Sequence, residues 1–116
     1  MLELPDGPWW DWDIQSYDSS RLCLAADHDL TYSHRLEVVF TDVAYLQCPT
    51  QFTEPVFREP TPAERDLVRR YLGEDPPVIV AFDLEAEIGW SGPLPCLIAA
   101  ETVEVTVGRV DRTIAG

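Results

Sequence analysis

The sequence predicts an α+β fold: an antiparallel β-sheet of about 5–7 strands, curled or sandwich-like, with one amphipathic α-helix at residues 62–72. Three observations favour this class. Apolar and polar side chains alternate with period two both before and after the middle of the chain, one segment has helical periodicity, and no break in composition divides the sequence. We expect a single domain at residues 1–116, because this length is typical of one domain with its own core.

Two strands are expected near the N-terminus. Residues 9–17 and residues 20–26 each alternate apolar with polar side chains, as a strand with one wet face does. The link Asp18-Ser19-Ser20 consists of short polar residues that can bond to the nearby backbone in a turn. The two strands should therefore form a hairpin.

A third strand is expected after a connection at residues 27–33. Apolar and polar residues alternate over residues 35–40, and residues 43–48 should also be extended. Thr41-Asp42, between them, could be a β-bulge in one long strand or a tight turn between two short strands. We favour the bulge. Residues 49–60 contain three prolines together with apolar side chains, so they should form an ordered surface loop rather than a free linker.

The helix has the most specific local signal in the chain. Thr61 and Glu64 match a capping box, Pro62 fits the first helical position, and Gly73 is suited to end the helix. Between them, four apolar residues form one stripe at helical spacing: Leu67, Val68, Tyr71 and Leu72.

Period two returns after the helix. Residues 78–86 alternate as a strand, and residues 88–95, with two glycines and two prolines, should be a loop. Residues 96–100 and 103–107 are expected to be further strands, which could be continuous with each other.

Acidic residues dominate the charge. Twenty-one Asp and Glu face 8 basic residues, for a net charge of −13, which argues against binding to nucleic acid or to an anionic membrane surface. No apolar run has the length of a membrane helix, and the first residues lack the pattern of a signal peptide, so a cytoplasmic location is expected.

The acids are unevenly distributed, since half of the basic residues lie at residues 58–73. Five carboxylates should lie on the wet faces of predicted strands: Asp11, Asp13, Asp83, Glu85 and Glu87. If their strands share a sheet, its outer face is an acidic field that would attract a basic protein partner. Solubility or adaptation to salt is the competing interpretation.

Trp10 and Trp12 should face the core, whereas Trp9 and Trp90 are less constrained and could stack on a ligand; core packing is the favoured interpretation of the tryptophans. The cysteines, Cys23, Cys48 and Cys96, form no C-x-x-C pair and stand among apolar residues. They are expected to be buried structural thiols.

One histidine cluster comprises Asp27, His28, Asp29 and His34. It is predicted to be a solvated loop rather than a metal site, because alternate residues of an extended segment point to opposite sides. No cofactor is expected, and the usual motifs of nucleophilic, metal or phosphate chemistry are absent from the sequence, which favours a protein that is not an enzyme.

These observations favour a non-enzymatic protein-binding module, of an immunity or inhibitor type, that covers a basic partner. The first alternative is a small-ligand or carbohydrate-binding domain that uses Trp9, Trp12, Trp90 and nearby acids. The second is a structural subunit or a homodimer, joined through a strand edge or through apolar residues around Phe52 and Phe57.

Overall fold

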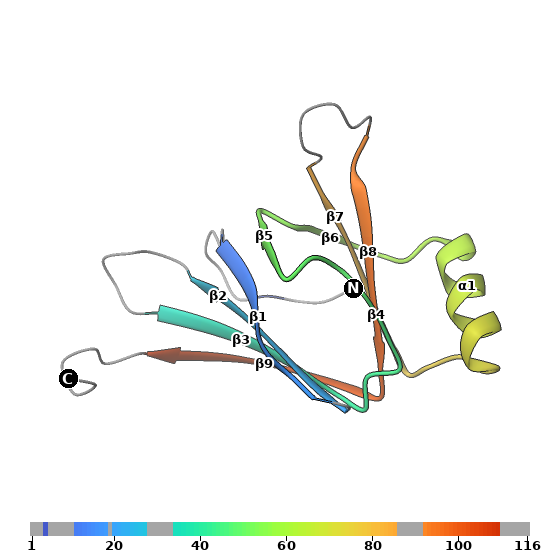
Figure 1. Cartoon of the computed structure of the whole chain (residues 1–116), viewed down its shortest axis with the longest axis horizontal. Helices are drawn as coiled ribbons and strands as arrows, with labels where there is room; N and C mark the ends of the chain where they lie inside the picture. Colours follow the sequence, from blue (N-terminus) through green and yellow to red (C-terminus); the bar gives the residue numbers. More distant parts are fainter. Residues whose placement is uncertain (1–3, 5–10, 19, 28–33, 86–91, 110–116) are drawn as a thin grey trace.

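The computed structural model describes residues 4, 11–18, 20–27, 34–85 and 92–109, which form two antiparallel sheets and one helix (Figure 1). The five-stranded sheet has the order β5-β1-β2-β3-β9, with the bounds Gln51–Thr53, Asp11–Tyr17, Arg21–Asp27, His34–Thr41 and Thr102–Arg109. The four-stranded sheet has the order β4-β8-β7-β6, with the bounds Tyr45–Gln47, Leu94–Ala100, Val78–Leu84 and Val56–Arg58. The α+β class with antiparallel pairing is confirmed, but the nine strands exceed the number expected.

The β1–β2 hairpin is present and has the turn chemistry that its sequence predicts. Asp18 Oδ1 accepts hydrogen bonds from the backbone N–H of Ser20 at 2.9 Å and of Arg21 at 2.8 Å. The register shifts between Ile14 and Ser16, which is a β-bulge in β1.

The chain crosses from one sheet to the other at a corner after Thr41. The prediction of a β-bulge within one long strand at this point was wrong. β3 ends at Thr41, Asp42 takes a φ of 53°, and β4 then begins in the other sheet. β8 passes into β9 at the same corner, where the N–H of Glu101 donates to the carbonyl of Thr41 at 3.0 Å. Strands that bend from one sheet into the next are a known way to join two packed sheets.

The surface loop expected at residues 49–60 contains two short strands instead. β5 pairs with β1 in one sheet and β6 pairs with β7 in the other, and Glu54 lies between them with a φ of 48°. Each strand has only three residues, so neither is long enough to show period two in the sequence.

The main core lies between the two sheets. Buried aromatic and aliphatic side chains from both sheets meet there, among them Trp12, Leu24, Phe40, Phe52, Phe82 and Ile98. Because each sheet contributes one apolar face, this core needs no helix.

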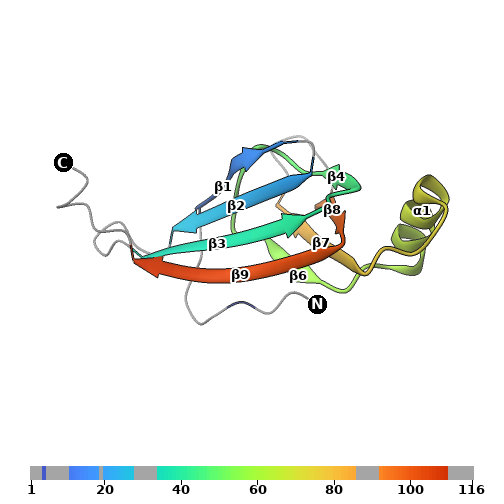
Figure 2. The same ribbon diagram turned by 90° about the horizontal axis from the view of Figure 1, so that it is seen from below.

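The helix α1 spans Pro62–Leu72, as predicted, with both hydrogen bonds of the capping box and Gly73 in the left-handed conformation. It covers the outer side of the four-stranded sheet, where Val68 packs against Ala81, Leu97 and Ala99 (Figures 1 and 2). One face of the strand predicted at residues 78–86 was expected to be exposed to solvent. The helix buries this face at Ala81, which is 1% exposed.

Candidate functional site

The predicted acidic residues do not share one sheet. Asp11 and Asp13 lie on β1 of the five-stranded sheet, whereas Asp83 lies on β7 of the four-stranded sheet and Glu85 follows that strand. The single acidic sheet face that we considered is thus not formed. Glu87, Trp9 and Trp90 lie outside the described residues.

Asp83 is engaged in an internal ion pair. Arg58 Nε donates to its Oδ2 at 2.9 Å and Arg58 Nη2 donates to its Oδ1 at 3.0 Å. The same guanidinium binds Glu64, and these hydrogen bonds raise the pKa of Arg58 above its ordinary value. Asp83 therefore has a role in the fold as a partner of Arg58.

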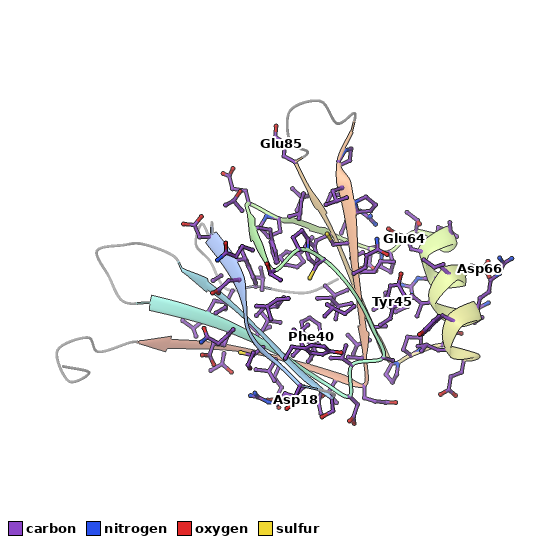
Figure 3. All side chains as sticks on the ribbon, in the orientation of Figure 1. Asp18, Phe40, Tyr45, Glu64, Asp66 and Glu85 are labelled. Carbon is purple, nitrogen blue, oxygen red and sulfur yellow. The ribbon has the colours of Figure 1, made fainter. Side chains whose placement is uncertain are left out.

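Glu85 lies at the same end of the β6–β7 pair as another carboxylate, that of Glu54. It lies at the end of β7 that is remote from the β1–β2 turn, which Asp18 marks in Figure 3. Glu54, between β5 and β6, is brought to the same end because β6 pairs with β7 and places Val56 opposite Asp83. Sequence reasoning missed Glu54, although Pro55 was a general signal for an interruption of regular structure.

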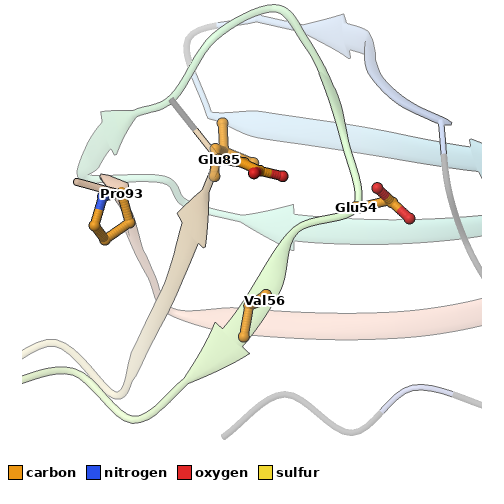
Figure 4. Close-up of a pocket in the computed structure, with 5 residues that line it drawn as sticks. Glu54, Val56, Glu85 and Pro93 are labelled. Atoms are coloured by element: carbon orange, nitrogen blue, oxygen red, sulfur yellow. The ribbon is translucent and has the colours of Figure 1, made fainter. Parts of the chain in front are cut away.

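Glu54 and Glu85 line a hollow of about 480 Å³ together with Val56, Leu84 and Pro93 (Figure 4). We call this feature the Glu54–Glu85 hollow. Val56 is 63% exposed, so an apolar surface is accessible beside the two exposed carboxylates. Such a combination suits the aliphatic stem and charged head of an arginine or lysine side chain.

Asp11 and Asp13 belong to a second acidic area, on the outer face of the five-stranded sheet. The strand registers place Asp13, Ala25 and Glu37 in one row across β1, β2 and β3, and Cys23 and Glu104 on the same face. Ala25 and Cys23 are each 4% exposed, so small buried residues lie between the acidic ones. β5 connects the two areas, because Thr53, next to Glu54, lies opposite Asp11.

Trp12 cannot stack on a ligand, as the carbohydrate hypothesis required. Its side chain is 2% exposed, and its ring stacks on that of Phe52 with the ring centroids 6.0 Å apart. The ring centroid of Phe57 lies 5.5 Å from that of Trp12. Phe52 is itself 7% exposed. The expectation that Trp12 faces the core is confirmed, and Phe52 belongs to that core rather than to an interface between copies.

None of the three cysteines, all of which the structure describes, is in a disulfide bond; Cys23 and Cys96 are buried and Cys48 is half-buried. Burial raises the pKa of Cys48 to about 11 and is the main cause that raises the pKa of Cys96 to about 12. Both thiols are therefore protonated at neutral pH, which does not suit a catalytic nucleophile.

Within the described ranges, no three His, Cys, Asp or Glu side chains are grouped as a metal site would need. Of the predicted histidine cluster, His28 and Asp29 lie outside those ranges, while Asp27 ends β2 and His34 begins β3. In the part of the chain that the structure covers, no helix combines the length and the apolar character needed to cross a membrane.

Comparisons with protein-family models, with curated proteins and with solved structures find no match for this chain. Its function must therefore be inferred from its own residues. Of the features described above, the Glu54–Glu85 hollow combines negative charge, apolar surface and a concave shape.

Proposed function

We propose that the chain is a non-enzymatic, protein-binding module of the immunity or inhibitor type, which covers a basic partner. The observation that carries this proposal is the Glu54–Glu85 hollow, where two carboxylates flank exposed apolar surface on a protein with a net charge of −13. In the proposed complex, an arginine or lysine of the partner enters the hollow.

Electrostatics supports a basic partner over a neutral one. The excess of acidic residues attracts positive charge over distances of about 10 Å at moderate salt, and this attraction speeds association. The hollow then adds short-range selectivity, because Glu54 and Glu85 can accept hydrogen bonds while Val56 and Pro93 contact the aliphatic stem.

The outer face of the five-stranded sheet extends this surface. Asp11 and Asp13 lie on β1, next to β5, and β5 leads directly into Glu54. A partner that fills the hollow can therefore also contact these two carboxylates.

The proposal is tested with short labelled peptides in which arginine and leucine alternate, against peptides of the same length with aspartate in place of arginine. Binding is measured by fluorescence anisotropy at low and high salt. We expect the double variant Glu54→Gln and Glu85→Gln to bind the basic peptide about tenfold more weakly than the unchanged chain does.

The matched control is the double variant Glu74→Gln and Glu101→Gln, which removes the same charge from exposed positions outside the hollow. It should retain most of the affinity. Equal losses in the two double variants would mean that net charge alone attracts the peptide, and the hollow would then have no specific role.

A small organic cation is a second candidate occupant, since about 480 Å³ falls within the size range of small-molecule sites. Arginine methyl ester provides the probe. Saturable binding of this ester with an affinity equal to that of the basic peptide would favour a small-ligand site over a protein partner.

A further inference from the structure

The paired residues of β4 and β8 end immediately before Cys48 on one strand and immediately after Cys96 on the other. The register pairs Tyr45 with Ala99, Leu46 with Ile98 and Gln47 with Leu97. Continued by one residue, the same register brings Cys48 opposite Cys96. Directly opposite residues of antiparallel strands have Cα atoms about 4.5–5.5 Å apart, within the range that a disulfide spans.

A side-chain hydrogen bond keeps the two segments together beyond the ladder. Gln47 Nε2 donates to the carbonyl oxygen of Pro95 at 3.2 Å, and Tyr45 Oη donates to Gln47 Oε1 at 2.7 Å. The residues that precede the two cysteines, Gln47 before Cys48 and Pro95 before Cys96, are thus in contact.

Both cysteine side chains face the same core. Cys96 is a buried member of the cluster between the two sheets, and Cys48 packs against that cluster. The two thiols are near enough that charge on Cys48 contributes to the raised pKa of Cys96. Cys23, by contrast, lies on the outer face of the five-stranded sheet, opposite Val39.

We propose that Cys48 and Cys96 form a reversible cross-strand disulfide when the protein meets hydrogen peroxide. This modification site is independent of the function proposed for the Glu54–Glu85 hollow.

The chemistry begins at Cys48, because Cys48 is half-buried whereas Cys96 is 1% exposed. The Cys48 thiolate attacks one oxygen of the peroxide, the O–O bond breaks, and hydroxide leaves, so that Cys48 becomes a sulfenic acid. The Cys96 sulfur then attacks the Cys48 sulfur, the S–O bond breaks, and the hydroxyl leaves as water with the proton of the Cys96 thiol. In total, two thiols are oxidised by two electrons and one peroxide is reduced to two waters.

The raised pKa of Cys48 sets the rate of this reaction. Since only the thiolate reacts, and the pKa of Cys48 is about 11, the rate should rise close to tenfold for each pH unit between neutral pH and about pH 10. Oxidation should thus be slow at neutral pH and fast in mild alkali.

The bond would close a loop that holds β5, β6, the helix and β7. Closing so long a loop lowers the entropy of the unfolded chain and stabilises the folded form. We expect oxidation to raise the melting temperature of the protein by roughly 10 °C, and a reductant such as dithiothreitol to reverse the change.

The test treats the full chain with hydrogen peroxide at about pH 9, blocks the remaining thiols with an alkylating reagent, and maps the peptides by mass spectrometry without reduction. The expected product is a pair of peptides linked through Cys48 and Cys96, whose mass is two hydrogen atoms below the sum of the two peptides in the thiol form. Cys23 should be alkylated. The variant Cys23→Ala should give the same linked pair, whereas Cys48→Ala should give none.

Three results would overturn the proposal. They are a link from Cys23 to either other cysteine, a bond between two chains, and oxidation of Cys48 to the sulfinic acid with Cys96 still a thiol. Because the peptide map is made on the unchanged chain, it does not depend on whether a variant folds.

Discussion

Arg58 holds the carboxylate of Glu64 with two hydrogen bonds, from Nη1 to Oε1 at 2.6 Å and from Nη2 to Oε2 at 2.8 Å. Arg58 ends the edge strand β6, and Glu64 lies in the first turn of α1, where it also completes the capping box with Thr61. Since the same guanidinium binds Asp83 on β7, one arginine links two strands and the start of the helix.

Replacing Arg58 by alanine should therefore destabilise the protein by about 2 kcal/mol, because Glu64 and Asp83, both partly buried, lose a charged donor. Urea denaturation followed by circular dichroism measures the change. Arg65→Ala is the matched control, since Arg65 lies 3.7 Å from Glu59 in an exposed ion pair, and it should have little effect. Equal stability of Arg58→Ala and the unchanged chain would contradict the linking role of Arg58.

Stability should also depend on pH through Glu64. Hydrogen bonds from Arg58, and further ones at Thr61, lower the pKa of Glu64 from 4.5 to about 2. The folded state therefore binds fewer protons than the unfolded state in this range, and the stabilisation is complete above about pH 4.5 and lost as the pH falls towards 2.

Comparison with Glu64→Gln isolates this contribution from that of the other acids. The difference in the free energy of unfolding between the unchanged chain and this variant should shrink as the pH is lowered from 4.5 to about 2. Chemical denaturation at several pH values measures it. A difference that stays constant with pH would show that the Glu64 carboxyl has an ordinary pKa.

Val68 should anchor the helix to the four-stranded sheet. Its side chain is 0% exposed among Ala81, Leu97 and Ala99, so Val68→Ala should cost about 2 kcal/mol in the free energy of unfolding. Leu67 is 47% exposed on the same helix, and Leu67→Ala should cost much less. Similar losses for the two variants in thermal or urea unfolding would argue against the observed orientation of the helix.

Gly73 ends the helix with a φ of 83°, and its N–H donates to the carbonyl of Arg69 at 2.7 Å. A Cβ added at this position would meet no atom within 4 Å, so the cost of Gly73→Ala is backbone strain alone, at about 1 kcal/mol. Gly73→Asn should cost less, because asparagine tolerates the left-handed region. Thermal unfolding of the two variants gives the ranking, and an alanine variant as stable as the glycine form would contradict it.

Local sequence patterns correctly predicted the features whose hydrogen bonds connect residues a few positions apart in the sequence. The bounds of the helix follow from Thr61, Glu64 and Gly73, and the first hairpin follows from Asp18, which bonds residues only two and three positions away. The alternation of apolar and polar residues predicted which side of β2 and β3 faces the core, where Leu24 and Val38 are buried.

The tertiary structure alone decided how these elements combine. β5 and β6 are too short for a periodic signal, and their pairing with β1 and β7 depends on segments distant in the sequence. Asp83 is paired with an arginine 25 positions away, a contact that no local pattern encodes.

For the candidate site, the sequence determined the acidic character of the chain and the exposure of Asp11 and Glu85. Only the pairing of strands that are remote in the sequence placed Glu54 in one hollow with Glu85 and set the β4–β8 register on which the proposed Cys48–Cys96 bond is based. The physical reason is the same in both cases: burial periodicity and turn bonds arise within a few residues, whereas the choice of sheet and partner strand depends on contacts between remote segments.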